Sequence, residues 1–447
     1  MITIKGGPHE AEYKALIKAF FPEGNIDYNI VPDDNLVHKN IEKHRLYRQL
    51  SEITGRELPW GDLTGVRPVR IPLGKMYEGY NNNEIFSHLK EVYAVGDEKC
   101  NYGIEIAGRE KKIIDSLGEY SDGIIKNHYC LYVGIPFCPS TCAYCSFTSY
   151  PLSRFASKID DYIDCLFKEL DMLAEVYDKY KLDAVYIGGG TPSTLAPDEL
   201  KKLIDYIRVR FNVPDNLEFC VECGRPDSID KDKLEALKKC NVNRICINPQ
   251  TLSDKTLKLM GRAHNSEQFL DAFKLARDIG FDNINTDIIL GLPDESIRDV
   301  ENTLHVLSEL NPESITVHSL SLKRAARLTK EENLQKDFND DVEIAMNRCV
   351  EKTRELFMNP YYLYRQKNMS GNLENTGFAK ESFECVYNIL MIEELCDIAA
   401  AGTGTVSKVT LGNGHIERVD AVKDVALYFE RFDEMMEKKR RFYSKWR

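Results

Sequence analysis

Three cysteines on one short loop constrain this chain more than any other feature of its sequence. Cys138, Cys142 and Cys145 form a C-x-x-x-C-x-x-C triplet directly after the apolar run LYVGIPF. Each of the three thiolates can bind one iron of a four-iron cluster, which leaves the fourth iron without a protein ligand. A cluster that only transfers electrons has cysteine on all four irons. The triplet therefore predicts a [4Fe–4S] cluster whose open iron S-adenosylmethionine (SAM) can chelate through its amino and carboxylate groups.

Zinc binding and disulfide bonding fit the triplet less well. A structural zinc site takes four N or S ligands, usually from two paired motifs, and no histidine lies within twenty residues after Cys145. Cys220 and Cys223 do have C-x-x-C spacing, but they lie on an expected strand. Residues three apart on a strand face opposite sides, so this pair is not expected to share a metal. Disulfides belong to exported proteins, and the sequence shows no export signal.

Charge and hydropathy exclude other classes of function. The chain has 59 Lys and Arg against 71 Asp and Glu, a net charge of −12. Nucleic-acid binding needs a basic footprint, and the basic cluster at 438–441 is expected to be a solvated helix face. No apolar run approaches the roughly 20 residues of a membrane span, and the N-terminus does not have the pattern of a signal peptide. We expect a cytoplasmic protein whose thirteen cysteines are reduced.

Between residues 126 and 320, strand-like apolar runs alternate with helical patterns. The runs cover 130–136, 184–187, 218–221, 244–247, 283–289 and 314–317, and the helical patterns cover 158–179, 197–210, 231–239, 253–279 and 296–310. This alternation implies parallel pairing with right-handed crossovers. We expect an α/β fold in which six units form an open, partial (β/α)6 barrel, with its chemistry at the C-terminal ends of the strands.

Two regions flank the expected barrel. Residues 1–125, with a helical pattern near 83–95, predict a small N-terminal α+β domain, and residues 321–447 predict a C-terminal mixed and helical domain that opens with a charged helical stretch at 328–357. The segment WGDLTGVRP at 60–68 is a glycine-rich turn that either packs or contacts substrate. The segment YYLYRQKN at 361–368 is either a half-buried strand or the lining of a substrate cleft.

The residues around the triplet resemble those of radical SAM enzymes. The stretch YVGIPFC, from Tyr132 to Cys138, is similar to the Y-[IV]-x-I-P-[FW]-C of the family around oxygen-independent coproporphyrinogen III oxidase. The segments 60–68 and 361–368, with the small-residue turn at 401–405, resemble the HemZ-type branch of that family. The resemblance covers nearly the whole chain and is most specific from 126 to 320.

The resemblance implies a set of SAM contacts at the strand ends. The glycine-rich loop is expected to hold the amino group, Glu222 to bind SAM, Gln250 to contact the ribose, Arg262 to pair with the carboxylate, and Asp287 to reach the adenosine hydroxyls. A guanidinium suits the carboxylate because its fork binds in bidentate fashion. The loop consists of Gly188, Gly189, Gly190 and Thr191. Taken alone, the glycines would indicate a plain turn and Glu222 a salt-bridged strand end.

Two tyrosines flank the triplet, and a histidine follows Arg262. Tyr132 matches the family tyrosine that approaches the sulfonium, and Tyr144 matches an aromatic residue against the adenine. Core packing is the alternative for both tyrosines. His264 is expected to be a solvent-exposed loop residue.

The resembled oxidase uses SAM to make a 5′-deoxyadenosyl radical after one electron reaches the cluster. The radical takes a hydrogen from a propionate of coproporphyrinogen III, and loss of carbon dioxide and an electron leaves a vinyl group. The implied partners are a tetrapyrrole and an electron donor such as flavodoxin or ferredoxin. Cations at the rim would bind the tetrapyrrole carboxylates, and the candidates are Lys323, Arg324, Arg327, Arg365 and Lys367.

Two positions depart from the best-known oxidases. Gly134 stands where they carry a histidine, and Phe147 where they carry a further cysteine. The form around the triplet resembles the heme-chaperone and heme-modifying branches equally well. Two alternatives therefore stay open beside oxidative decarboxylation. One is a heme-binding chaperone, and the other is a radical SAM methyltransferase that acts on heme.

Overall fold

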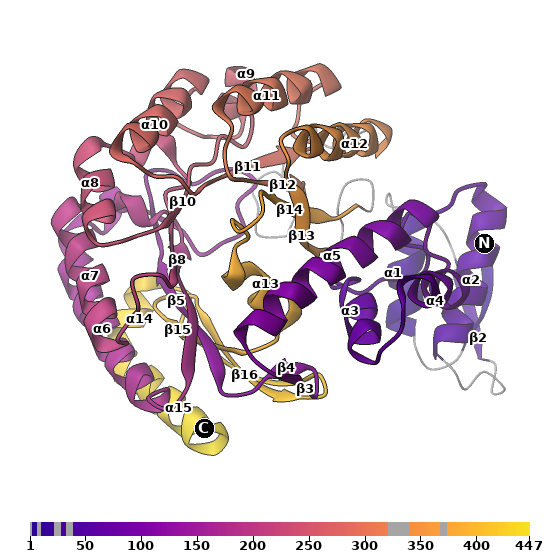
Figure 1. The fold of residues 1–447 in the computed structure, drawn as a ribbon, viewed down its shortest axis with the longest axis horizontal. Coiled ribbons are helices and arrows are strands. Elements are labelled where there is room, and N and C mark those ends of the chain that lie inside the picture. The colour runs from indigo at the N-terminus through magenta and orange to yellow at the C-terminus, as the bar shows by residue number, and fades with distance from the viewer. Residues whose placement is uncertain (1, 7–9, 22–27, 33–38, 321–338, 367–372) are drawn as a thin grey trace.

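A computed structural model describes residues 2–6, 10–21, 28–32, 39–320, 339–366 and 373–447 of the chain (Figure 1). The candidate substrate residues Lys323, Arg324, Arg327 and Lys367 lie outside these described residues, as does part of the expected helical stretch at 328–357. Arg365 lies within them. Among the described helices, none is both long enough and apolar enough to cross a bilayer.

Six parallel strands form the centre of one large sheet, as the sequence predicts. They are β5 (His128–Ile135), β8 (Lys181–Gly189), β9 (Glu218–Glu222), β10 (Arg244–Cys246), β11 (Ile284–Leu290) and β12 (Ser314–Ser319). Each strand pairs in parallel with the next one in this series. Both faces of these strands are covered, so their apolar runs are nearly continuous, as is typical of buried parallel strands.

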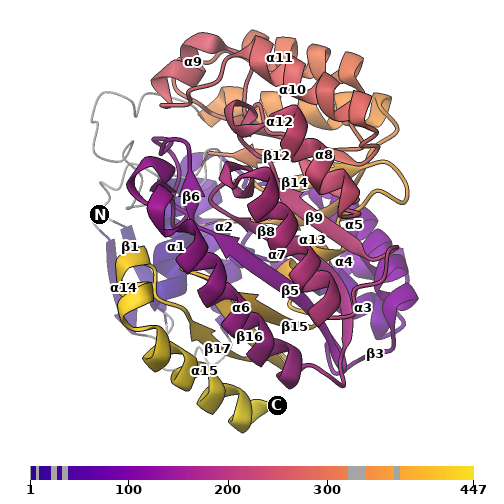
Figure 2. The same cartoon turned by 90° about the vertical axis from the view of Figure 1, so that its left-hand side faces the viewer.

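Helices cover the outer face of the curved sheet (Figure 1). They are α6 (Ile159–Val176), α7 (Pro197–Arg210), α8 (Lys231–Lys239), α9 (Asp254–Leu259), α10 (Ser266–Ile279) and α11 (Ile297–Leu310). Figure 2 shows α6, α7 and α8 side by side over β5 and β8. The helical pattern expected at 253–279 is two helices, because Gly261 has a φ of +71° and Asn265 caps a new helix.

The C-terminal residues extend this sheet at both edges. Beyond β12 lie β14 (Asn375–Ala379) and β13 (Asn359–Tyr364), both antiparallel. Beyond β5 lies β15 (Asp397–Ala401), a parallel neighbour, followed by the antiparallel strands β16 (Val406–Gly412) and β17 (His415–Asp420). In the described chain, β13 and β17 are the two edges of an eleven-stranded sheet, so the barrel stays open.

Four helices accompany these C-terminal strands. They are α12 (Asn339–Glu355), α13 (Val386–Glu393), α14 (Val425–Glu430) and α15 (Phe432–Trp446). In Figure 1, α13 lies on the concave side of the sheet. The basic cluster at 438–441 lies on α15. The expectation that this cluster is a solvated helix face is wrong for one of its residues. Lys439 is fully buried and pairs with the equally buried Glu169 at 3.1 Å, because it shares the inward stripe of α15 with Met435, Met436 and Tyr443.

The N-terminal residues form a small parallel sheet and a helical layer. The elements are β1 (Ile2–Gly6), α1 (Glu10–Phe20), β2 (Tyr28–Pro32), α2 (Lys39–Thr54), α3 (Arg70–Tyr77), α4 (Asn82–Tyr93), α5 (Asp97–Leu117), β3 (Tyr120–Ser121) and β4 (Ile124–Ile125). Strand β1 pairs in parallel with β2. The long helix α5 crosses the open side of the barrel (Figure 1). An Asn81 capping box starts α4, at the position of the helical pattern near 83–95.

The two segments that stand out in the flanking regions contact each other. Trp60 is 1% exposed, and its Nε1 donates to Glu374 at 2.8 Å, while Lys99 pairs with the same carboxylate at 2.6 Å. The Arg365 guanidinium donates to the Leu63 carbonyl, and the Arg365 backbone N–H donates to the Val66 carbonyl at 2.8 Å. The segment at 60–68 therefore has the packing role, which was one of the two roles expected for it.

The same contact corrects two expectations about the C-terminal tyrosine segment. Arg365 is only 7% exposed and binds the N-terminal segment, so it does not lie at an open rim. Tyr361 and Tyr362 are both buried, at 0% and 4% exposure, so β13 is buried along its centre and not on one face only. The reason is that α5 and α13 both pack against β13.

Candidate functional site

The residues singled out by sequence motifs gather at one edge of the barrel. The cysteine loop follows β5, the glycine-rich loop ends β8, and Glu222 ends β9. Gln250 follows β10, and Asp287 lies within β11. Parallel strands bring their C-terminal ends to the same edge, which is where parallel barrels carry their chemistry. The structure thus brings together positions that are far apart in sequence.

The cysteine loop is fastened at both ends. A short strand β6 (Phe137–Cys138) pairs with β7 (Tyr150–Pro151), and the Tyr150 N–H donates to the Pro136 carbonyl at 2.8 Å. Within the loop, the Ala143 N–H donates to the Met260 carbonyl at 2.9 Å. The loop therefore has a defined path beside the segment that carries Arg262.

The three thiols are not arranged around a single point. In the part of the chain that the structure describes, no three His, Cys, Asp or Glu side chains gather as ligands of one metal ion. A mononuclear zinc site requires that geometry, whereas a four-iron cluster binds each thiolate to a different iron. Cys138 and Cys142 are 9% and 8% exposed, and Cys145 is partly exposed.

Two guanidinium groups lie beside the middle cysteine. Arg225 Nη1 lies 3.7 Å and Arg262 Nη1 lies 3.9 Å from Cys142 Sγ. Arg225 also donates to the Ser140 carbonyl at 2.9 Å and to Ser140 Oγ at 3.0 Å, while Asp227 holds its guanidinium with two hydrogen bonds of 2.8 Å. This positive charge compensates the negative charge of a thiolate-bound cluster, and Arg225 fixes the loop between the first two cysteines.

Arg262 is placed by four polar contacts inside the site. Its Nη1 donates to Tyr144 Oη at 2.8 Å, and its Nη2 donates to the carbonyls of Gly224 and Asn248 at 2.8 and 2.9 Å. Its Nε approaches His264 Nδ1 at 3.4 Å. The guanidinium thereby lies between the cysteine loop and the ends of β9 and β10. That is where a partner for the SAM carboxylate is expected.

His264 is buried, which corrects the expectation of an exposed loop residue. The residue is 3% exposed, and burial together with the charge of Arg262 lowers the pKa of its imidazole to about 3. The imidazole is therefore neutral at physiological pH. It supports Arg262 from the side away from the cysteines, because the segment between α9 and α10 folds inward there.

The glycine-rich loop packs against the backbone that leads into the cysteine loop. A Cβ at Gly190 would lie 2.6 Å from the Phe137 carbonyl oxygen, and Gly189 has a φ of +106°. The N–H groups of Gly190 and Thr191 donate to the carbonyls of Ile135 and Phe137, both at 2.7 Å. Only glycine allows this approach. Thr191 Oγ1 then lies 3.3 Å from Cys138 Sγ.

Two carboxyl groups on β9 and β11, the two neighbours of β10, interact electrostatically and titrate differently. Burial and the charge of Asp287 raise the pKa of Glu222 to about 7, and Tyr186 Oη donates to the Glu222 carboxylate. Burial alone would raise the pKa of Asp287, but His318 and Asn285 lower it overall. Asp287 also accepts from Asn248 Nδ2 at 3.0 Å and from Asn285 Nδ2 at 2.7 Å. Asp287 is therefore the ionised member of the pair, and Glu222 holds the proton more readily.

Tyr132 lies inside the barrel below these groups. Its ring stacks with those of Tyr186 and Tyr387 at centroid distances of 6.2 and 6.0 Å, and Tyr186 stacks with Tyr387 at 4.5 Å. A Cβ at the neighbouring Gly188 would lie 3.3 Å from Tyr132 Oη. Tyr132 thus packs in the core and also reaches the glycine-rich loop. Core packing is therefore compatible with the expected approach of Tyr132 to the sulfonium.

Gln250 has an unusual backbone and an unsatisfied side chain. Its φ is +65°, a left-handed conformation, and its backbone N–H and carbonyl bond to Asp287 and Ile289 of β11 at 2.9 Å each. Its Oε1 is buried and has no hydrogen-bond partner among the described residues. Buried amide oxygens are nearly always bonded, so this atom is available to a ligand. With the glycine-rich loop, the carboxyl pair and Arg262, the donor set fits SAM, and the cysteine triplet fits the cluster.

Several residues at this edge were not assigned a role from the sequence. Arg225 and Ser140 fix the cysteine loop, Asn248 and Asn285 hold Asp287, and Tyr186 holds Glu222. His318 Nε2 lies 3.5 Å from Asp287 Oδ2. All lie within or directly after the strands or within the cysteine loop. Their position, rather than any motif, was the signal available in the sequence.

Comparison with known proteins agrees with this geometry. Residues 132–307 match the radical SAM superfamily. The chain is 36% identical over 406 residues to the oxygen-independent coproporphyrinogen-III oxidase-like protein HemZ of Bacillus subtilis (strain 168), and this match covers 90% of the chain and 80% of the relative. It is 30% identical to the heme chaperone HemW of Escherichia coli (strain K12), over 64% of the chain and 72% of that relative.

A solved structure has the same fold. Coproporphyrinogen III oxidase (HemN) from Escherichia coli, a radical SAM enzyme, matches with a TM-score of 0.57 at 21% sequence identity, over 72% of each chain. The chain therefore belongs to the radical SAM superfamily and, within it, to the family of oxygen-independent coproporphyrinogen-III oxidase-like proteins, and its cofactors are a [4Fe–4S] cluster and SAM.

Proposed function

We propose that this protein oxidatively decarboxylates the propionates of coproporphyrinogen III to vinyl groups without oxygen and so forms protoporphyrinogen IX in heme biosynthesis. The observation that supports this most is the extent of the similarity to HemZ, which covers 90% of the chain. A match over 406 residues is longer than the region at 126–320 and therefore takes in parts of the flanking regions as well. The proposal includes an external one-electron donor such as flavodoxin or ferredoxin.

When bound, the cofactors would supply one 5′-deoxyadenosyl radical for each reacting propionate, which would take one hydrogen atom from it; the propionate would then lose carbon dioxide and pass one electron to an external acceptor. The chain's own residues bind and orient the reactants. In this proposal Cys138, Cys142 and Cys145 hold the cluster. Arg262 pairs with the SAM carboxylate, and the backbone of Gly188, Gly189, Gly190 and Thr191 receives the amino group. Glu222 adds a charge contact when it is ionised.

Further side chains fix the nucleoside end and exclude water. Gln250 offers its unsatisfied Oε1 to the ribose, Asp287 accepts from the adenosine hydroxyls, and Tyr144, held by Arg262 at 2.8 Å, faces the adenine. The stacked rings of Tyr132, Tyr186 and Tyr387 fill the barrel beneath. These apolar rings would keep water away from a carbon radical, and a closed site of this kind prevents side reactions. Tyr132 approaches the sulfonium from this side.

Anaerobic turnover tests the proposal. The reconstituted protein is incubated with SAM, a reductant, an electron acceptor and coproporphyrinogen III, and mass spectrometry follows protoporphyrinogen, carbon dioxide loss and 5′-deoxyadenosine. We expect the vinyl product and deoxyadenosine to appear together and both to disappear in Cys142→Ala. Deoxyadenosine with heme, but never a vinyl product from coproporphyrinogen, would overturn the proposal.

A heme chaperone is the second candidate, and one position favours it. Gly134 stands where the best-known oxidases carry histidine, and a Cβ at this position would lie 2.6 Å from Thr405 Cγ2. The turn after β15 therefore leaves no room for a histidine side chain at 134. The similarity to HemW supports the same reading. Stoichiometric heme binding without any turnover of coproporphyrinogen would establish the chaperone.

A further inference from the structure

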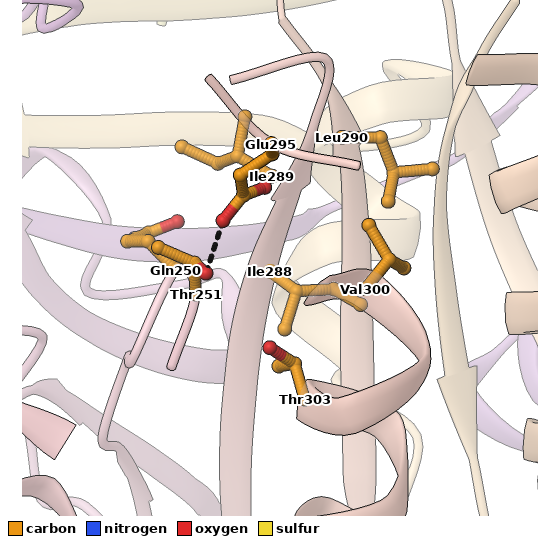
Figure 3. A pocket seen from close by; sticks show the side chains of 8 residues that line it. All are labelled: Gln250, Thr251, Ile288, Ile289, Leu290, Glu295, Val300 and Thr303. Carbon is orange, nitrogen blue, oxygen red and sulfur yellow. Dashed lines mark hydrogen bonds between the residues drawn. The ribbon is translucent and has the colours of Figure 1, made fainter. Parts of the chain in front are cut away.

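A small pocket beside the strand ends contains one more carboxyl group. Gln250, Thr251 and Glu295 line it together with Thr303 of α11, and apolar side chains form the rest (Figure 3). The apolar members are Ile288, Ile289 and Leu290 of β11 and Val300 of α11. Glu295 belongs to the turn that joins β11 to α11, and no motif in the sequence gave it a role.

The pocket adjoins a residue of the site with an uncommon backbone conformation. Gln250 is a non-glycine residue with a φ of +65°, a conformation that persists only where surrounding contacts enforce it. Its backbone N–H and carbonyl are both bonded to β11. These two bonds fix the position of the Gln250 backbone relative to β11. The path of the chain after Gln250 depends on the contacts of the residues that follow.

Glu295 and α11 fix that direction. The Thr251 hydroxyl donates to Glu295 Oε1, and the same oxygen of Thr251 accepts from the Ser253 N–H at 3.0 Å. The Leu252 N–H donates to Thr303 Oγ1 at 3.2 Å. Each residue after Gln250 is thus bonded within the turn, to the β11–α11 connection or to α11. Of these contacts, the bond to Glu295 is the one next to Gln250.

The surroundings of Glu295 explain why this bond is well defined. Burial among the apolar side chains raises the pKa of its carboxyl to about 7, with a small contribution from the charge of Asp299 on α11. The nearby Lys255 of α9 pairs with Asp294 at 3.1 Å. Thr251 is the hydrogen-bond donor that the structure records for the Glu295 carboxyl. The bond remains in either protonation state, since a carbonyl oxygen accepts in both.

We propose that Glu295 is a positioning residue for SAM binding, which holds Thr251 and thereby keeps Gln250 in the left-handed conformation that presents its side chain to the ribose. The inference rests on the proposed role of Gln250 in SAM binding and does not depend on which tetrapyrrole is the substrate. Glu295 itself touches no reactant.

Three substitutions and a double variant test this role by the dissociation constant of SAM. Glu295→Leu fills the apolar pocket but removes the acceptor, and Thr251→Val removes the donor at equal size. A single hydrogen bond contributes about 0.5–1.5 kcal/mol, so each should weaken SAM binding about three- to tenfold. Thr251→Val also removes the acceptor of the Ser253 N–H, so the double variant should bind SAM no more weakly than Thr251→Val alone, which has already lost the bond to Glu295. Glu295→Gln keeps a carbonyl acceptor and should bind SAM as the unchanged protein does.

Two controls separate the possible failures. Glu301→Leu changes an exposed carboxylate of α11, which pairs with Arg348 at 3.4 Å, and should leave SAM binding unchanged. Gln250→Ala tests the underlying assignment and should weaken SAM binding. If Gln250→Ala has no effect, the proposed SAM site is wrong at that residue.

The inference about Glu295 fails under other results. One such result is that Gln250→Ala weakens SAM binding but Glu295→Leu leaves the dissociation constant of SAM unchanged. A change in the melting temperature of Glu295→Leu would not alter that conclusion. Additive losses in the double variant would also overturn it, because Glu295 and Thr251 would then act separately. Equal weakening in Glu295→Gln and Glu295→Leu would show that charge, and not the bond to Thr251, is what counts.

Discussion

The edge of the barrel and the contact between the two flanking regions use buried polar residues in different ways. At the edge, Gln250 has a left-handed backbone and its Oε1 has no partner among the described residues, and Glu222 holds its proton up to a pH of about 7. At the contact, Trp60 and Lys99 both bind the buried Glu374, and Arg67 binds Glu394. Gln250 thus keeps one buried polar atom without a partner among the described residues, whereas the Glu374 carboxylate accepts from both Trp60 and Lys99. This difference predicts which substitutions change ligand binding and which change stability.

The largest effect is expected at the cysteine loop. Cys142→Ala removes the thiolate of one iron, so the reconstituted protein should lose most of its iron and form no 5′-deoxyadenosine above background. Iron analysis and mass spectrometry measure both. Cys223→Ala is the matched control, because this cysteine is fully buried but outside the loop. If Cys142→Ala kept a full cluster, the triplet would not be its ligand set.

Arg262→Lys sharpens the comparison at the same edge. The substitution keeps the charge but loses the planar fork. Hydrogen bonds to charged groups contribute about 1.5–3 kcal/mol, so the dissociation constant of SAM should rise about tenfold or more. Equilibrium dialysis with the reconstituted protein measures it. Arg277→Lys, which affects an ion pair with Glu313 away from the site, should leave SAM binding unchanged. Equal affinity in Arg262→Lys would remove Arg262 from the SAM contacts.

Trp60→Phe probes the contact between the flanking regions. It leaves the buried Glu374 without one donor, which should lower the free energy of unfolding by about 1–3 kcal/mol in urea titration. SAM affinity should stay within about twofold, because this region binds no cofactor in our account. Trp446→Phe, the other tryptophan of the chain, should change stability by less than about 0.5 kcal/mol. Weaker SAM binding in Trp60→Phe would break the distinction between the two regions.

The smallest effect is a pH dependence of SAM binding. Burial and the charge of Asp287 raise the pKa of Glu222 to about 7, so the SAM-free fold gains stability from this group at low pH and loses that contribution as the pH rises through about 7. SAM is cationic at the sulfonium and ammonium, and it favours ionised Glu222. Its dissociation constant should therefore fall as the pH rises toward 7 and then level off. In Glu222→Gln the dissociation constant should be larger and almost independent of pH. An unchanged pH profile in Glu222→Gln would assign the titration to another group.

The barrel and most of its site residues could be predicted from the sequence because their signals are local. Apolar runs of strand length alternate with helical patterns from 126 to 320, and the structure places its six central strands on those runs. The cysteine triplet, the glycine-rich loop and Gln250 each directly follow such a run. A strand end is a local property, and parallel pairing then brings all strand ends together.

The remaining features depend on contacts between distant parts of the chain. Strand β15 pairs with β5, and Asp397 lies opposite Tyr129, although no local pattern links the two. Lys439 is buried only because Glu169 on α6 lies opposite it, and His264 is buried because the chain between α9 and α10 turns toward Arg262. Arg365 looked like a rim cation, but it binds a segment about three hundred residues earlier in the chain.

The most direct test of the central claim follows one hydrogen atom. Coproporphyrinogen III deuterated at the propionate carbon that loses hydrogen is incubated anaerobically with the reconstituted protein, SAM, a reductant and an electron acceptor, and the isotopic composition of 5′-deoxyadenosine is measured. Our account predicts one deuterium in deoxyadenosine for each vinyl group formed. Unlabelled deoxyadenosine, with the tetrapyrrole recovered unchanged, would contradict it.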